Sequence, residues 1–208
     1  MNPHDLSALG AGFSNESLGS QAVFRTALQS ISHPGRCINL DHDAQVPKSG
    51  HSASAALLLA LLDADCTLWL SPKLAHSDAA VWLHFHTGCR LVNDFTQAQF
   101  AWVAAGDTCP ALDTFAQGTD AFPDQSATCV LDALALQSGS HDATGWTLTG
   151  PGISGSTGLT AEGLAPDFLT QWAANHARFP RGVDIFLTIH QQVVSLPRTT
   201  HIELAREN

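Results

Sequence analysis

Lysine and tyrosine are nearly missing from this sequence. Its 208 residues include no tyrosine and only two lysines, Lys48 and Lys73. Covalent catalysis through a Schiff base requires a lysine amine held in a pocket. Both lysines instead stand in polar connections, directly after Pro47 and Pro72. Neither lysine therefore looks placed for a Schiff-base cofactor, and we expect no cofactor on this chain.

Basic residues are scarce as well. The chain has 9 lysines and arginines against 19 aspartates and glutamates, which gives a formal net charge of −10. Proteins that bind nucleic acid carry an excess of basic residues, because these neutralise the phosphate backbone. The charge balance therefore excludes nucleic acid as an expected partner.

Charged residues of both signs form 13% of the chain, which is low for a protein that also contains 44% hydrophobic residues. Such a composition excludes a disordered, charge-rich chain. The length is that of one domain with a substantial core. We predict a single domain over residues 1–208, with residues 1–12 and 201–208 as peripheral or flexible tails.

Long apolar segments are also absent. The longest uninterrupted apolar run, Ala55–Leu62, is far shorter than the roughly 18 to 20 residues that cross a bilayer. The first basic residue is Arg25, so the beginning of the chain lacks the positive start of a secretory signal. We therefore expect a cytoplasmic protein without a membrane segment.

The 5 cysteines form no C-x-x-C pair. They stand about twenty or more residues apart, unlike the ligands of zinc or iron-sulfur sites. We expect free thiols that are mostly buried.

Helical and strand patterns alternate along the chain. Apolar residues recur at helical spacing over Ser20–Ser32, and Pro34 disfavours a longer helix. The other expected helices are Ser52–Ala64, Ser77–Phe85 and Pro166–Arg178. The expected strands are Cys37–Leu40, Thr67–Leu70, Gln97–Ala104, Ala127–Leu134, Trp146–Thr149, and a final hairpin of Val183–Ile189 and Val193–Leu196. The alternation predicts an α/β fold with a mixed sheet.

Motifs for nucleotide binding and nucleophilic catalysis are incomplete. The segment Gly150–Gly155 matches G-x-G-x-x-G, but Pro151 removes a backbone donor and no helix follows directly. The same region lacks the last glycine of G-x-S-x-G, and no G-x-x-x-x-G-K-[ST] occurs. We interpret Gly150–Gly158 as an irregular loop.

Histidines offer no complete metal site. His84 and His86 share a face only if they lie in a strand, and the sequence places no third ligand near them, so we predict no metal. We expect His86 to hydrogen-bond within its own turn, with Thr87 and Gly88. His176 extends the apolar stripe of Trp172 by one helical turn, which favours a boundary histidine over a ligand contact.

Arginines after prolines are the most specific local pattern. Arg181 and Arg198 each follow a proline, and Arg36 follows Pro34-Gly35. A rigid turn can present a guanidinium to a carboxylate or phosphate of a ligand. Alternatively, these arginines pair with acidic residues of the chain itself, such as Asp184. Two further acids, Asp120 and Asp124, could form an acid-base pair but are first of all typical turn residues.

Several of these short motifs, taken in order, resemble the PhnH family, subunits of the bacterial carbon-phosphorus lyase core complex. The resemblance extends from about Val23 to Thr200. It depends on Phe24-Arg25 with Pro34-Gly35, Phe85-His86-Thr87-Gly88, Gly118-Thr119-Asp120 with Phe122-Pro123 and Ser126-Ala127-Thr128, Leu148-Thr149-Gly150-Pro151-Gly152, Asn175-His176 with Phe179-Pro180-Arg181-Gly182-Val183-Asp184, and Leu196-Pro197-Arg198-Thr199-Thr200.

The resemblance implies a three-layer α/β/α fold with a mixed sheet, similar to the large domain of pyridoxal-phosphate-dependent transferases but without the cofactor. It also implies a homodimer that assembles with the subunits PhnG, PhnI and PhnJ. That complex transfers methylphosphonate onto the ribose C1 of ATP and releases adenine, and a later radical step breaks the carbon-phosphorus bond. The iron-sulfur cluster of the radical step belongs to another subunit.

We expect an accessory subunit with catalysis on its partners. Two alternatives remain: a free-standing enzyme of the pyridoxal-phosphate type, and a binding module for a phosphonate or ribosyl phosphate. The candidate ligand or partner contacts are Arg36, His86, Asp120, Gly150, Gly152, His176, Arg181, Asp184 and Arg198.

Overall fold

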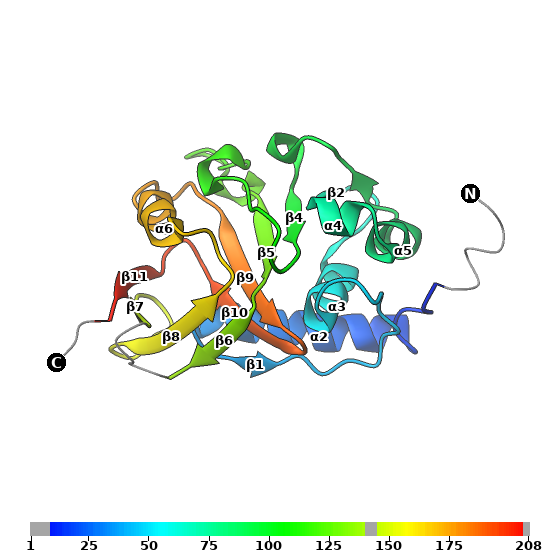
Figure 1. Ribbon diagram of the computed structural model, residues 1–208, viewed down its shortest axis with the longest axis horizontal. Coiled ribbons are helices and arrows are strands. Elements are labelled where there is room, and N and C mark those ends of the chain that lie inside the picture. The colour runs from blue at the N-terminus through cyan, green and yellow to red at the C-terminus, as the bar shows by residue number, and fades with distance from the viewer. Residues whose placement is uncertain (1–8, 140–144, 206–208) are drawn as a thin grey trace.

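A seven-stranded mixed sheet with layers on both faces forms the centre of the computed structural model, which describes residues 9–139 and 145–205 (Figure 1). The helices are α2 (Glu16–Ser32), α3 (Ser52–Leu61), α4 (Pro72–Ala75), α5 (Asp78–Thr87), α6 (Phe168–His176), and the 3-10 turns η1 (Phe95–Gln97), η2 (Leu112–Thr114) and η3 (Pro123–Gln125). The strands are β1 (Ile38–Asn39), β2 (Thr67–Leu70), β3 (Arg90–Leu91), β4 (Phe100–Val103), β5 (Thr128–Asp132), β6 (Ala135–Ser138), β7 (Trp146–Thr149), β8 (Thr157–Glu162), β9 (Asp184–Ile189), β10 (Gln192–Leu196) and β11 (His201–Leu204).

The large sheet has the strand order β1-β10-β9-β5-β4-β2-β3. Pairing is parallel from β9 through β5, β4 and β2 to β3, and antiparallel between β9 and β10 and between β10 and β1. The predicted α/β fold with a mixed sheet is confirmed. The predicted hairpin is confirmed too, since β9 and β10 pair in register from Ile185↔Leu196 to Ile189↔Gln192.

Alternate residues of the central strands belong to two hydrophobic cores, one on each face. Leu68 and Trp102 pack with α2, α3 and α5, whereas Trp69 and Leu131 pack with η2, α6 and the second sheet. This division follows from the two-residue period of a strand. Figure 1 shows α6 and strands β6 to β8 on one side of the sheet, and α3, α4 and α5 on the other.

The layer around α6 differs from a purely helical one. It contains a four-stranded antiparallel sheet of order β11-β7-β8-β6. The sequence predicted only β7 among these strands, because β6 and β8 consist largely of small and polar residues of intermediate exposure. The predicted loop at Gly150–Gly158 therefore ends at Ser156, where β8 follows.

Helix ends are determined by local caps. The Asn15 side chain accepts a hydrogen bond from the backbone N–H of Leu18, so α2 begins four residues before the predicted start. Ser77, where the sequence predicted a helix to start, is the N-cap of α5, because its hydroxyl accepts from the N–H of Ala79. Helix α5 ends at Thr87 and is capped by Gly88, which adopts a left-handed conformation with φ 71°.

The segments predicted as peripheral or flexible tails make regular contacts where the structure describes them. Residues 201–204 form strand β11, which pairs with β7. Near the other end, the Gly10 carbonyl accepts hydrogen bonds from the side chains of Trp82 and His86, and Gly12 forms a β-bridge with Gln45. Residues 1–8 and 206–208, also predicted as tails, lie outside the described residues.

Within residues 9–139 and 145–205, no helix has the length and apolar character needed to cross a bilayer.

Candidate functional site

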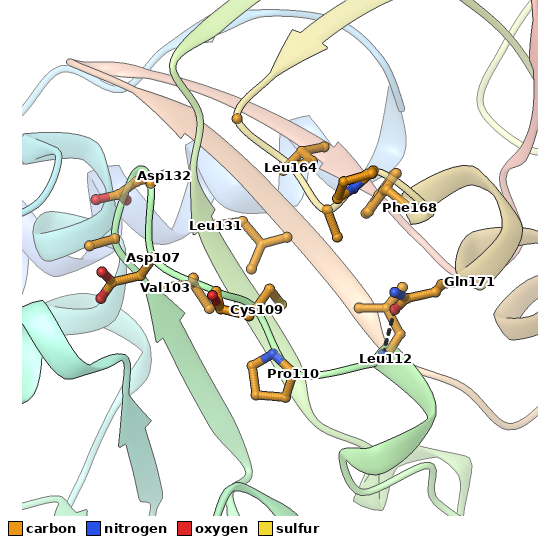
Figure 2. Close-up of a pocket in the computed structure, with 16 residues that line it drawn as sticks. Val103, Asp107, Cys109, Pro110, Leu112, Leu131, Asp132, Leu164, Phe168 and Gln171 are labelled. Carbon is orange, nitrogen blue, oxygen red and sulfur yellow. Dashed lines mark hydrogen bonds between the residues drawn. The ribbon is translucent and has the colours of Figure 1, made fainter.

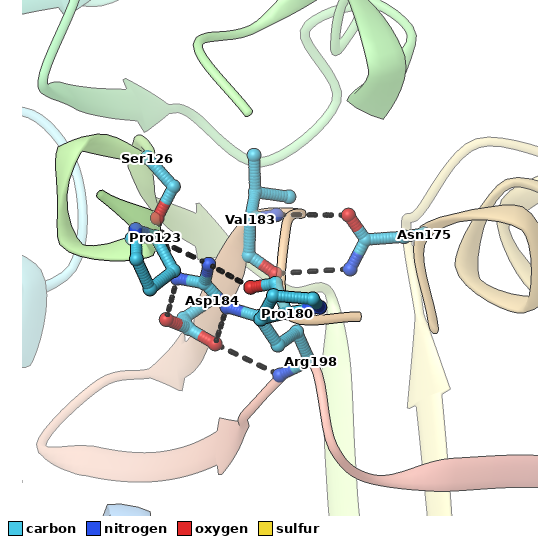
Figure 3. A network of polar contacts seen from close by, with 7 residues as sticks. All are labelled: Pro123, Ser126, Asn175, Pro180, Val183, Asp184 and Arg198. Atoms are coloured by element: carbon cyan, nitrogen blue, oxygen red, sulfur yellow. Dashed lines mark hydrogen bonds and ion pairs between the residues drawn. The ribbon is translucent and has the colours of Figure 1, made fainter. Parts of the chain in front are cut away.

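The Arg198 guanidinium lies at the centre of a hydrogen-bond network at the amino-terminal ends of β5 and β9 (Figure 3). Its Nε donates to Asp184 Oδ1 at 3.1 Å, and its Nη1 donates to the carbonyls of Pro123 and Pro180 at 3.0 and 3.1 Å. Its Nη2 reaches Asp184 and the hydroxyl of Ser126. These contacts occupy all five N–H groups of the guanidinium.

The Arg198 side chain is 11% exposed. A phosphate or carboxylate of a ligand would therefore have to displace Asp184 or a backbone carbonyl. The alternative of internal pairing is confirmed for this arginine, and its role is to hold three loops together.

Arg181 has a different environment. Its Nε lies 3.1 Å from Asp120 Oδ1, with both side chains at least half exposed. Internal pairing is confirmed here too, although such an exposed pair contributes little to stability. Arg36 is exposed on the loop before β1. The three arginines that the sequence singled out therefore do not converge on one anion site.

Close packing requires glycine at positions 150 and 152 of the loop that begins at Gly150. Gly152 has φ +82°, and a Cβ there would lie 2.4 Å from the carbonyl oxygen of Ser32. A Cβ on Gly150 would lie 2.9 Å from the carbonyl oxygen of Thr199. The loop thus lies against the end of α2 and the segment after β10, and a close backbone approach explains both glycines.

The two candidate histidines form structural hydrogen bonds. His86 donates from Nε2 to the Gly10 carbonyl at 2.8 Å, so the prediction that it bonds within its own turn is wrong. The pattern could not identify this partner, which stands 76 positions away. His176 Nδ1 bonds to the Arg198 carbonyl at 2.9 Å, which confirms it as a satisfied boundary histidine.

A crevice at the opposite end of the parallel strands was not predicted as a site. It consists of two adjoining pockets, of about 270 and 350 Å³, at the carboxyl ends of β2, β4 and β5. Ala104 and Asp132 line both pockets. Figure 2 shows the first pocket, with Asp107 and Asp132 on one side and Phe168 and Gln171 on the other. In open α/β sheets, ligands bind at this edge of the strands.

Asp132 is the buried carboxylate of the crevice, with 3% exposure. Its Oδ1 accepts from Ser54 Oγ at 2.6 Å, Trp102 Nε1 at 2.8 Å and the hydroxyl of Thr188 at 3.1 Å. Its Oδ2 accepts from the backbone N–H of His51 at 3.0 Å. A signal for this residue was present in the sequence, because Asp132 is the single charge within the apolar strand predicted at Ala127–Leu134.

Lys73 and Asp107 line the outer part of the crevice. The Lys73 amine lies 3.3 Å from Asp107 and is 60% exposed, whereas the Asp107 side chain is 9% exposed. Burial, the largest single influence, raises the pKa of Asp107, but hydrogen bonds from Ser71 and Lys73 and the charge of Lys73 outweigh it and lower the pKa. An exposed, ion-paired amine does not fit a Schiff base, which needs a lysine enclosed in a pocket.

Cys109 is the thiol of the first pocket. Burial raises its pKa to about 12, so at neutral pH it is a thiol and not the nucleophilic thiolate. Burial also raises the pKa values of Cys66, Cys89 and Cys129. Across the described part of the chain, no group of three or more histidines, cysteines or acids could hold a metal ion.

Comparison with known proteins identifies the family. The protein-family model described as "Bacterial phosphonate metabolism protein (PhnH)" matches residues 11–203. A relative from Rhizobium meliloti (strain 1021), "Alpha-D-ribose 1-methylphosphonate 5-triphosphate synthase subunit PhnH", is 39% identical over 191 residues, 92% of this chain and 94% of the relative. Another from Stutzerimonas stutzeri, "Putative C-P lyase subunit protein HtxG", is 30% identical over 184 residues, 88% of this chain and 86% of the relative. The chain therefore belongs to the PhnH family.

Proposed function

We propose that this chain is a cytoplasmic subunit of a carbon-phosphorus lyase core complex in phosphonate catabolism. In that complex it supports the transfer of methylphosphonate onto the ribose C1 of ATP with release of adenine. One observation carries the proposal: a synthase subunit is 39% identical to this chain over 92% of its length.

The proposed role is accessory, with catalysis on the partner subunits PhnG, PhnI and PhnJ. Three features of the chain support it. The guanidinium of Arg198 is saturated by internal acceptors. Burial raises the pKa of Cys109 to about 12, and the Lys73 amine is exposed and paired with Asp107. In this proposal the chain has a structural role in the complex and binds no cofactor.

The proposal also includes a likeness of the fold to the large domain of pyridoxal-phosphate transferases.

The decisive experiment is reconstitution with and without this chain. The complex of PhnG, PhnI and PhnJ is purified with this chain or with it omitted, and formation of the ribosyl methylphosphonate product from ATP is measured. We expect co-purification with the partners and no product from the chain alone. Turnover of ATP and methylphosphonate by the isolated chain would contradict the accessory role, and failure to co-purify would contradict membership of the complex.

The proposed homodimer fits the outer face of α2. Phe24, Leu28 and Ile31 lie at spacings of four and three residues, on one face of the helix, and are 46%, 51% and 41% exposed. Two copies of a chain with net charge −10 repel each other, so contact is favoured where charge is lowest. The 17 residues of α2 carry only Glu16 and Arg25. We therefore assign this apolar stripe to a second copy of the chain.

A single added charge tests the dimer surface. Leu28→Glu introduces a carboxylate at the centre of the stripe, and we expect the isolated protein to change from dimer to monomer in size-exclusion chromatography with light scattering. Gln29→Glu adds the same charge at an exposed neighbouring position and should leave the dimer intact. A monomeric wild-type chain, or a dimeric Leu28→Glu variant, would contradict the assignment.

A further inference from the structure

Three prolines and one aromatic ring line an open hollow of about 330 Å³ beside the Arg198 network, named here the proline hollow. Its apolar residues are Pro123, Phe179, Pro180 and Pro197, and its other lining residues are Asp124, Asp184, Arg198 and Thr199. Phe179 is 61% exposed. Figure 3 shows Pro123 and Pro180 next to Arg198. The surface of the hollow is therefore mainly apolar and open to solvent.

The Arg198 network fixes the shape of the proline hollow. Its Nη1 donates to the carbonyls of Pro123 and Pro180 at 3.0 and 3.1 Å, and Arg198 directly follows Pro197. One buried guanidinium thus holds all three loops that carry the prolines. A proline ring also fixes φ of its own residue. A surface that is ordered before binding lowers the entropic cost of binding a partner.

One carboxylate of the proline hollow has no counterion. Asp124 is exposed, and within residues 9–139 and 145–205 no basic side chain forms an ion pair with it. By contrast, Asp120 of the same loop pairs with Arg181, and Asp184 pairs with Arg198. The hollow therefore combines an apolar surface with one uncompensated negative charge.

This combination favours a different protein as the occupant of the hollow. Exposed aromatic rings are enriched at the centres of protein–protein contacts. A second copy of the chain fits poorly, because a two-fold contact places one surface against itself and would bring two Asp124 carboxylates together. Nucleic acid and other anions are disfavoured by the same carboxylate. A basic side chain instead compensates the charge of Asp124 and can stack on the ring of Phe179.

We propose that the proline hollow is the contact of this chain with another subunit of the complex. The partner supplies a segment with an arginine or lysine next to an apolar side chain. The apolar side chain fills the hollow, and the basic group pairs with Asp124 and lies over Phe179. This inference rests on the proposed function, since it requires a partner subunit. It concerns a surface separate from the proposed dimer stripe, because no residue of α2 lines the hollow.

A binding assay with matched charge changes tests the basic part of the contact. The complex of PhnG, PhnI and PhnJ is purified without this chain and immobilised, and binding of this chain is followed by biolayer interferometry. Asp124→Lys reverses the charge at the hollow, and Asp65→Lys makes the same change at an exposed position that does not line it. We expect Asp124→Lys to raise the Kd at least about tenfold and Asp65→Lys to change it less than about twofold.

A second pair of variants tests the apolar part of the contact. Phe179→Glu places a carboxylate in the hollow, whereas Phe85→Glu places one at a 57% exposed ring of α5 that does not line it. Phe179→Glu should raise the Kd at least about tenfold, and Phe85→Glu less than about twofold. If Phe179→Glu does not fold, Asp124→Asn at its exposed position supplies the test. Its Kd should depend less on NaCl between about 50 and 500 mM than the Kd of the wild type does.

The outcomes distinguish this inference from the proposed function. Failure of the wild-type chain to bind the complex contradicts the proposed function, and the inference falls with it. If the wild type binds and either Asp124→Lys or folded Phe179→Glu binds equally well, the inference is overturned while the proposed function stands. A loss of binding as large in Asp65→Lys as in Asp124→Lys would overturn it too, because the effect would then come from net charge and not from the hollow.

Discussion

Replacement of Arg198 by alanine should destabilise the protein far more than the same change at Arg181. The two arginines have the same sequence context, each directly after a proline. Arg198 is 11% exposed and its five N–H groups are all engaged, whereas Arg181 is 50% exposed and makes an ion pair with an 80% exposed Asp120.

The structure sets the size of the two effects. Breaking a buried ion pair by removal of one partner costs about 3–5 kcal/mol. Asp184 is 34% exposed, so water partly replaces the lost guanidinium, and we expect about 2–4 kcal/mol for Arg198→Ala. Exposed pairs contribute about 0–1 kcal/mol, so Arg181→Ala should cost less than about 1 kcal/mol.

Urea unfolding followed by tryptophan fluorescence measures both values. With a slope of about 2 kcal/mol per molar urea, Arg198→Ala should lower the midpoint by about 1–2 M, and Arg181→Ala by less than about 0.5 M. Arg198→Lys should fall between them, because an ammonium cannot reproduce the planar fork of five donors. Equal midpoints for the two alanine variants would refute the structural role of Arg198.

Three further results are expected. Gly152→Ala should cost at least about 1 kcal/mol more than Gly155→Ala in the same unfolding assay, because both glycines have positive φ but only the Cβ at 152 meets a backbone oxygen, at 2.4 Å. Equal losses would contradict the close approach. Cys109 should react with iodoacetamide at pH 8 only after unfolding, since its pKa is raised to about 12. Because folding raises the pKa of Cys109 from 9.0 to about 12, this thiol's contribution to the free energy of unfolding is complete below pH 9.0 and is lost as the pH rises toward about 12. If a Cys109→Ser variant loses free energy of unfolding as steeply over this range as the wild type does, Cys109 makes no such contribution.

Much of the main sheet could be predicted from the sequence. Strand β2 has the predicted bounds, and β9 and β10 differ from them by one residue at a single end each. Most of their residues are apolar and the segments are short, so the local pattern is enough to predict them. By contrast, β6, β8 and β11 contain few large apolar residues. They are strands because they pair within the second sheet, β6 with β8, and both β8 and β11 with β7. The local pattern does not contain that pairing.

The candidate site could be predicted only in part. The motifs around Gly150, Asp184 and Arg198 do come together, but their polar groups satisfy each other. The crevice could not be located, because Lys73 of α4, Cys109 of the segment after β4 and Asp132 at the end of β5 are far apart in the sequence. Asp132 was visible only as a charge within an apolar strand, which by itself does not name its neighbours.

Composition and pattern determined that this chain is an acidic α/β protein of low charge, with two lysines in connections after prolines, and its ordered motifs indicated the PhnH family. Tertiary structure alone decided that all five guanidinium N–H groups of Arg198 form hydrogen bonds within the chain, that Arg181 is exposed, and that Asp132 lies buried in a crevice. The physical reason is that burial and hydrogen bonding depend on partners far away in the sequence. Two identical Pro-Arg pairs therefore acquire opposite roles from their surroundings.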